Sequence, residues 1–198
     1  MTSKALSSWH GRVVLTFTGK YDTNIKTGED YHGRALGDLW GMAPKSVPKA
    51  NAPAFIPSTY MAFDARGHEA QRERGQFVAL TGDIDKGNVP MVDVITHARV
   101  LFGSEAAIFI YSTGSATPED KRWRIIAPLM EPVPFKRWNE AQEAFFAYMD
   151  ANGVPMDRSL AKAGQPVFLP NVPRDRRDQH GQPNFYETYI AGEMGIAL

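Results

Sequence analysis

Two aspartates that lie two positions apart, Asp83 and Asp85, have the types and spacing that most directly suggest chemistry. They end the largely apolar run QFVALTGDID at residues 76–85, which predicts a β-strand. Side chains at positions i and i+2 of a strand point to the same face, so both carboxylates project together while Ile84 faces the core. Two such charges repel each other unless a cation lies between them. The pair therefore predicts a site for a hard divalent ion such as Mg²⁺ or Mn²⁺.

This acidic pair has a catalytic and a structural interpretation. In phosphoryl-transfer sites, two carboxylates hold the ions while water and substrate phosphates occupy the remaining positions. Alternatively, the strand ends in a turn whose aspartates are solvated, and Lys86 and Gly87 then continue that turn. The position directly after an apolar strand favours the metal site.

A polar hairpin at residues 111–126 offers groups that could bind phosphate. Arg122 and Arg124 are two positions apart and share one strand face, and such a pair of guanidiniums can clamp phosphate oxygens. The hydroxyls of Ser112, Ser115 and Thr117 could add hydrogen bonds. Taken alone, the arginines are more typical of a charged hairpin edge, where positive residues block unwanted strand pairing.

A third acidic residue, Asp157, follows the strongest helix prediction of the chain. That helix covers residues 135–152, and Gly153 ends it. Asp157 then lies at a junction between a loop and a strand, where it could complete the metal site. By itself it is equally typical of a turn or of a helix N-cap.

Strands and helices alternate around these residues. The sequence predicts strands at 13–18, 76–85, 106–112, 122–129 and 167–169, and helices at 34–42, 66–74, 89–102 and 135–152. Residues 43–57 predict an extended loop, because each of the four prolines removes a backbone donor and restricts the residue before it. The order strand, helix, strand, strand, helix, strand in the second half is typical of the split βαβ pattern of RRM-like folds.

Composition limits the class of protein. The 198 residues are 43% hydrophobic and contain no cysteine, so a metal must be held by oxygen or imidazole. There is no signal-peptide core and no apolar run of membrane-spanning length, which predicts a soluble cytoplasmic protein without a membrane partner.

The 22 basic and 22 acidic residues balance, which argues neither for nor against nucleic acid. A local cluster, Arg174, Arg176 and Arg177, predicts a solvated tail.

Three segments together resemble the archaeo-eukaryotic primase superfamily, and are most similar to the primase-polymerase domains of phages and mobile elements. The segments are LTGDID, STGSATPEDKRWRIIAPL and MDRSLAKAGQPVFLP, in the order and spacing of that family. The match covers residues 75–173, about half of the chain. It implies an α+β fold in one domain, 1–198. Its parts would be an N-terminal accessory α/β layer at 1–75, an RRM-like catalytic core at 76–173 and a C-terminal extension at 174–198.

The resemblance implies template-directed nucleotidyl transfer, in which a DNA primase or polymerase synthesises or extends primers with two divalent metals, Mg²⁺ or Mn²⁺. Asp83 and Asp85 match the metal ligands of the first motif, and Asp157 matches the ligand of the third. The implied nucleotide-binding residues are Ser115, Thr117, Arg122, Arg124 and Lys86. The partners would be single-stranded DNA, an NTP or dNTP and a helicase domain or subunit, since the chain would be part of a longer primase-helicase in the bacterial host cytoplasm.

The sequence departs from this family at Ala116, where the family has a histidine that contacts the phosphates of the incoming nucleotide. Alanine cannot donate a hydrogen bond, and the loss of one such donor typically slows catalysis by about 10²–10³-fold. The resemblance therefore implies an impaired enzyme that still binds metal and nucleotide. A natural loss and an engineered histidine-to-alanine change both explain the alanine, and the intact TPE and RWR residues around it favour the engineered change.

Two other functions remain as alternatives. A degenerate primase fold that binds single-stranded DNA or a replication origin would explain Ala116 as a natural loss. A metal-dependent glycosyltransferase would explain Asp83 and Asp85, but neither the arginine hairpin nor Asp157. We expect the large aromatic residues of the N-terminal half to pack in the core rather than to stack on template bases: Trp9, Tyr21, Trp40 and Tyr60.

Overall fold

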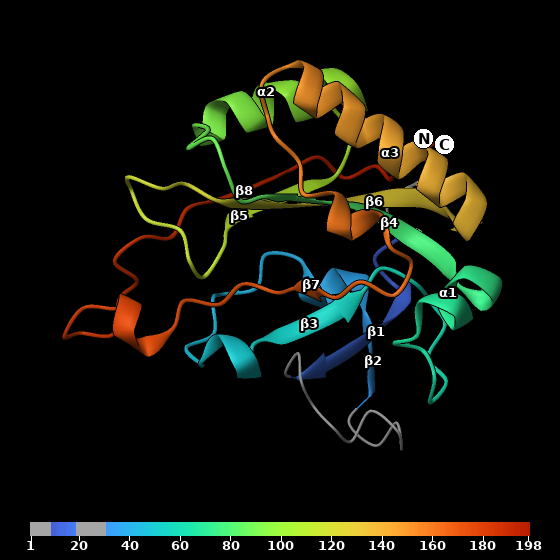
Figure 1. The fold of residues 1–198 in the computed structure, drawn as a ribbon, viewed down its shortest axis with the longest axis horizontal. Helices are drawn as coiled ribbons and strands as arrows, with labels where there is room; N and C mark the ends of the chain where they lie inside the picture. The colour runs from blue at the N-terminus through green and yellow to red at the C-terminus, as the bar shows by residue number, and fades with distance from the viewer. Residues whose placement is uncertain (1–8, 19–30) are drawn as a thin grey trace, which may run out of the picture.

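The fold consists of two antiparallel sheets and a layer of helices (Figure 1). A computed structural model describes residues 9–18 and 31–198. Within these residues, α2 (Met91–Phe102) and α3 (Phe135–Ala151) cover one face of the first sheet, and the second sheet lies against its other face. The predicted α+β class is confirmed. Among the described residues, no helix combines the length and apolar character that a membrane-spanning segment needs.

The first sheet contains the predicted split βαβ unit. Its strands, in spatial order, are β4 (Gln76–Ile84), β6 (Trp123–Pro134), β5 (Ile108–Ser112) and β8 (Thr188–Ala191). Helix α2 connects β4 to β5, and β6 returns between them and pairs antiparallel with both. Strands β4 and β5 are therefore parallel and separated by β6, which is the arrangement that the order of predicted elements indicates.

Helix α3 is held against β4 by an apolar face and two polar contacts. Trp138, Phe145 and Met149 are spaced for one helix face, and all three are buried. The Trp138 indole stacks on Phe77 of β4 with ring centroids 4.2 Å apart, and its Nε1 donates to the Ala79 carbonyl at 2.9 Å. These contacts fix the helix along the strand that carries the aspartates.

The buried Gln142 amide on α3 satisfies the free edge of β4. Its Oε1 accepts a hydrogen bond from the Thr81 N–H at 3.1 Å, and its Nε2 donates to the Thr81 carbonyl. A sheet edge carries unpaired backbone groups, and leaving them buried without partners is costly. One side chain therefore replaces a neighbouring strand at this position.

The second sheet has the order β2 (His32–Ala35), β1 (Val13–Thr18), β3 (Pro53–Ile56) and β7 (Val167–Phe168). The helix predicted at residues 34–42 is wrong: the segment contains the end of β2 and a short 3₁₀ helix, Leu36–Leu39. The loop predicted at 43–57 is wrong in part, because it contains the 3₁₀ helix Lys49–Asn51 and strand β3. Proline is tolerated there because Pro53 is the first residue of the strand.

The strand after α3 does not complete the RRM-like sheet. The predicted strand at 167–169 forms β7, which pairs with β3 in the second sheet. The edge of β4 is already occupied: Val78 N–H donates to the Pro57 carbonyl at 2.9 Å, and Asp157 N–H donates to the Asp83 carbonyl at 2.8 Å. Strand β8 instead extends the opposite edge beside β5. The predicted boundaries after residues 75 and 173 stay a prediction.

The prediction of a solvated tail is wrong for Arg176 and Arg177, because both guanidiniums donate hydrogen bonds to the protein. The half-buried Arg177 guanidinium donates to the Val172 carbonyl at 2.9 Å and to carbonyls of the 44–45 segment at 3.1 Å. Arg176 Nη1 donates to the Ser115 carbonyl at 2.9 Å, whereas Arg174 is exposed. The acceptors are backbone carbonyls, which every residue has, so the residue types do not indicate these contacts.

The N-terminal aromatic residues pack where the two sheets meet. Trp9 is 1% exposed, and its ring lies 4.7 Å from that of Trp40, which in turn contacts the Phe109 ring on β5. The Tyr60 hydroxyl donates to Asp64 at 2.7 Å. Core packing is therefore confirmed for Trp9 and Trp40, while Tyr21 lies outside the described residues.

We expect Gln142→Leu to lower the free energy of unfolding by about 2–3 kcal/mol, because the Thr81 N–H and carbonyl would both be buried without partners. Chemical denaturation measures this change. Glu140→Leu, an exposed substitution on the same helix, is the matched control and should change stability by less than about 0.5 kcal/mol. Equal effects of the two substitutions would contradict the edge-capping role of Gln142.

Candidate metal and nucleotide site

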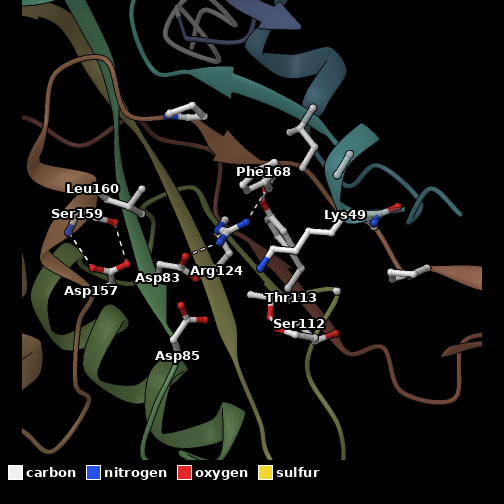
Figure 2. A pocket seen from close by; sticks show the side chains of 18 of the residues that line it. Lys49, Asp83, Asp85, Ser112, Thr113, Arg124, Asp157, Ser159, Leu160 and Phe168 are labelled. Atoms are coloured by element: carbon white, nitrogen blue, oxygen red, sulfur yellow. Dashed lines mark hydrogen bonds and ion pairs between the residues drawn. The ribbon is translucent and has the colours of Figure 1, made fainter. Parts of the chain in front are cut away.

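Three carboxylates meet where β4 ends (Figure 2). Asp83 is the penultimate residue of β4 and Asp85 follows the strand, while Asp157 comes from the loop after α3. One oxygen of each lies within 4.8 Å of the others. Ile84 between the two strand-end aspartates is fully buried, so the side chains alternate as the strand geometry requires. The structure thus brings together the three predicted metal ligands.

Asp83 and Arg124 form a buried ion pair across adjacent strands. They are directly opposite in the register of β4 and β6, and they are 7% and 8% exposed. Arg124 Nη1 also donates to the Phe168 carbonyl of β7 at 3.0 Å, which ties the first sheet to the second. Burial raises the pKa of Asp83, and the Asp85 and Asp157 carboxylates act in the same direction against the opposing effect of Arg124.

Tyr111 reinforces the same junction. Its hydroxyl donates to the Phe168 carbonyl at 2.6 Å, so this one oxygen accepts hydrogen bonds from both β5 and β6. Burial raises the pKa of the Tyr111 hydroxyl, which therefore stays a protonated donor. Two donors on one carbonyl therefore fix β7 against the strands β5 and β6.

Asp157 is held by a local turn. Its Oδ1 accepts from the Ser159 N–H and its Oδ2 accepts from the Ser159 hydroxyl, both at 2.8 Å. Asp157 is also the N-cap of the 3₁₀ helix Arg158–Ala161, so it caps that helix and lies in the acidic cluster at once. The positioning role of Ser159 has a signal in the local sequence, because an aspartate two residues before a serine is typical of such turns.

The residues present fit a divalent oxygen-binding ion. Asp83 Oδ1 is buried and has no hydrogen-bond partner among the described residues, which is costly for a carboxylate oxygen unless a cation contacts it. Three carboxylates this close repel one another unless a cation or proton compensates them. Carboxylate oxygens are the ligands that Mg²⁺ and Mn²⁺ prefer.

The acidic cluster forms one wall of a cavity of about 460 Å³. This volume lies within the range of about 300–1,000 Å³ that small-molecule and cofactor sites occupy. Hydroxyls of Thr113 and Ser115, which are 3.2 Å apart, lie on the loop after β5, and the Phe168 side chain lines the cavity from β7. Lys49 lines it from the N-terminal half, although its proline-rich surroundings carry no signal for such a role.

Of the predicted nucleotide-binding residues, Ser115 and Arg124 line this cavity, whereas Thr117, Arg122 and Lys86 do not. Arg122 is paired with Asp120 at 2.6 Å. The Thr117 hydroxyl accepts from the Asp120 N–H at 3.0 Å and stabilises the hairpin turn.

Ala116 lies beside the cavity rather than in its wall. Its N–H donates to the Thr113 carbonyl at 3.0 Å, and the residue is 6% exposed. It lines a second, smaller cavity of about 100 Å³ together with Thr117 and Arg176. The alanine methyl group offers this space no polar atom.

Comparison with known proteins supports the fold. No protein-family model and no curated protein matches the sequence. Among solved structures, the AEP domain of the primase-polymerase of cyanophage S-2L aligns over 92% of this chain and 84% of its own, with a TM-score of 0.51 and 13% identity. The polymerase domain of Mycobacterium tuberculosis Ligase D, in complex with DNA, aligns over 81% of this chain and 69% of its own, with a TM-score of 0.44 and 14% identity.

The class of fold follows from the first of these comparisons. The chain has the fold of an archaeo-eukaryotic primase (AEP) domain, as the sequence motifs indicate. At 13% identity this likeness concerns the fold.

We expect Mn²⁺ to raise the melting temperature of the protein, because an ion that binds only the folded state stabilises it by about 2.7 kcal/mol at 100 times its dissociation constant. Asp85→Asn should abolish most of this shift, and Asp93→Asn, at an exposed position on α2, should preserve it. The shift should shrink as the pH falls through the raised pKa of Asp83, because protons compete with the ion. An equal shift in Asp85→Asn would contradict the assignment.

We expect Arg124→Met to destabilise the protein by about 3–5 kcal/mol, because it leaves the Asp83 carboxylate buried and unpaired. Adding Asp83→Leu should recover most of the loss, since a buried ion pair can be replaced by apolar residues at little cost. Arg122→Met, which removes a more exposed pair on the same strand end, should cost less than about 1 kcal/mol. If the changes in the free energy of unfolding caused by Arg124→Met and by Asp83→Leu simply add in the double variant, the two side chains are not coupled.

Proposed function

We propose that this chain is a metal-dependent nucleotidyltransferase of the primase-polymerase kind, which synthesises or extends primers on a single-stranded DNA template. The observation that carries the proposal is the cluster of Asp83, Asp85 and Asp157 on the wall of a nucleotide-sized cavity. Two-metal nucleotidyl transfer needs such a cluster of carboxylates beside space for a triphosphate. The AEP fold supports the same class of reaction, because the similar cyanophage domain is described as a primase-polymerase.

In this proposal, Asp83, Asp85 and Asp157 hold Mg²⁺ or Mn²⁺. When bound, the ions would neutralise phosphate charge and lower the pKa of the attacking hydroxyl. The protein itself positions the ligands: Arg124 holds the Asp83 carboxylate, and Ser159 holds both oxygens of Asp157. Ligands fixed in this way need no rearrangement when the substrate binds.

The substrate in this proposal is an NTP or dNTP whose phosphates face the acidic cluster. The hydroxyls of Thr113 and Ser115 would donate to phosphate oxygens, and the Phe168 ring offers an apolar surface to the nucleoside. Phosphate roles for Thr117, Arg122 and Lys86 stay predictions, as does a helicase partner.

Ala116 favours a second candidate, a nucleotide-binding or single-stranded DNA-binding module that has lost catalysis. A methyl group cannot donate to a phosphate oxygen, so the transition state loses one stabilising contact. The two candidates differ in whether a histidine at this position produces activity on the existing metal site.

We expect Ala116→His to increase primer synthesis on single-stranded DNA by about 10²–10³-fold over the chain as it stands, because it adds one donor to the phosphates. The assay measures radiolabelled product with Mg²⁺ or Mn²⁺ and a mixture of NTPs and dNTPs. Asp85→Asn in the Ala116→His background should abolish the product, and Asp93→Asn in that background is the matched control.

Product that persists after Asp85→Asn would contradict the metal role. If Ala116→His makes no product while the chain binds single-stranded DNA, the binding module is the better account and the enzymatic proposal fails.

A further inference from the structure

The cavity is lined by cationic side chains as well as by carboxylates. Three cationic side chains line it, and they come from different parts of the chain: Lys49, Arg124 and Arg176. Arg124 is engaged by Asp83 and the Phe168 carbonyl, so its charge is already compensated. The other two are therefore the cationic groups of the cavity that remain for an anionic ligand.

Neither Lys49 nor Arg176 forms an ion pair in the part of the chain that the structure describes. Lys49 begins the 3₁₀ helix before β3, and Figure 2 shows its side chain extending into the cavity. An ammonium group without a carboxylate partner, aimed into a cavity that already contains three carboxylates, is available to an anionic ligand.

Arg176 reaches the cavity from the C-terminal side. Its Nη1 donates to the Ser115 carbonyl at 2.9 Å and lies 3.5 Å from the Ala116 carbonyl. These contacts use part of a guanidinium that has five N–H donors, so other donors remain for a ligand. The residue lines both the main cavity and the smaller one beside Ala116. A fixed positive charge thus lies next to the loop position that has no polar side chain.

We infer that Lys49 and Arg176 are the triphosphate-binding cations of this cavity, to which the Ala116 methyl group contributes no polar atom. This inference rests on the proposed function and names the residues that would bind its substrate. The metal ligands lie on one side of the triphosphate, and the two cations lie on the other. Nucleotide binding then depends on the N-terminal and C-terminal parts of the chain as well as on the strands that carry the aspartates.

The inference predicts that Lys49 and Arg176 contribute more to the affinity for a nucleoside triphosphate than to the affinity for a nucleoside monophosphate. Isothermal titration calorimetry with Mn²⁺ and without template would compare dATP and ATP with dAMP and AMP. We expect Lys49→Met and Arg176→Met each to weaken triphosphate binding by about 10- to 100-fold, as for charge-assisted hydrogen bonds. Monophosphate binding should change by less than about threefold.

Three further variants make the test specific. Lys45→Met removes an exposed lysine of the same segment that does not line the cavity, and it should bind triphosphates as the unchanged chain does. Lys49→Arg and Arg176→Lys retain the charges and should recover most of the affinity. Lys49 is exposed, so Lys49→Met should fold normally, which thermal denaturation verifies.

Each result bears on a different claim. If the unchanged chain binds triphosphates and both methionine variants bind them equally well, the inference is overturned while the proposed function stands. Equal losses for triphosphate and monophosphate would also overturn it, because the residues would then act on the structure of the cavity. If the unchanged chain binds no nucleotide with Mn²⁺, the proposed function and the inference fail together.

Discussion

The site depends on one buried ion pair between two neighbouring strands. Asp83 and Arg124 face each other across β4 and β6, between the two sheets, where neither charge has much access to water. A lone charge in that position would be strongly unfavourable, so each residue requires the other. Because Arg124 also donates to the Phe168 carbonyl, the same pair joins the sheets. Its charge is used locally, and Asp85 and Asp157 are left as an excess of negative charge that a divalent ion can compensate.

The rest of the fold follows from what surrounds β4. One face of this strand packs on α3, and its outer edge is satisfied by the Gln142 amide, the Pro57 carbonyl and the Asp157 N–H. No further strand can pair there, so the chain after α3 passes to the second sheet as β7. That path brings Asp157 beside Asp83 and forms the cavity between the two sheets. The edge contacts of one strand thus determine both the topology and the position of the third carboxylate.

The elements nearest the aspartates could be predicted from the sequence because their signals are local. Side chains alternate in direction along β4, which indicates that Asp83 and Asp85 share a face. The spacing of Trp138, Phe145 and Met149 indicates the buried face of α3. The remaining features depend on tertiary contacts. Strand β7 has the same composition whichever sheet it joins, and the cavity brings together Lys49 and Arg176, which are more than 100 residues apart in the sequence. The local sequence of Asp157 fits a turn as well as a metal ligand, and it is the family resemblance that favours the ligand.

The most direct test is to locate the ion. Crystals of the protein grown with Mn²⁺ and a nucleoside triphosphate, measured at the manganese absorption edge, would give an anomalous difference map. We expect one or two peaks within about 2.0–2.4 Å of carboxylate oxygens of Asp83, Asp85 and Asp157, the usual range for such ions. Triphosphate oxygens should complete the coordination. A bound triphosphate with no anomalous peak at these carboxylates, or a peak elsewhere on the surface alone, would contradict the account of this cluster as a catalytic metal site.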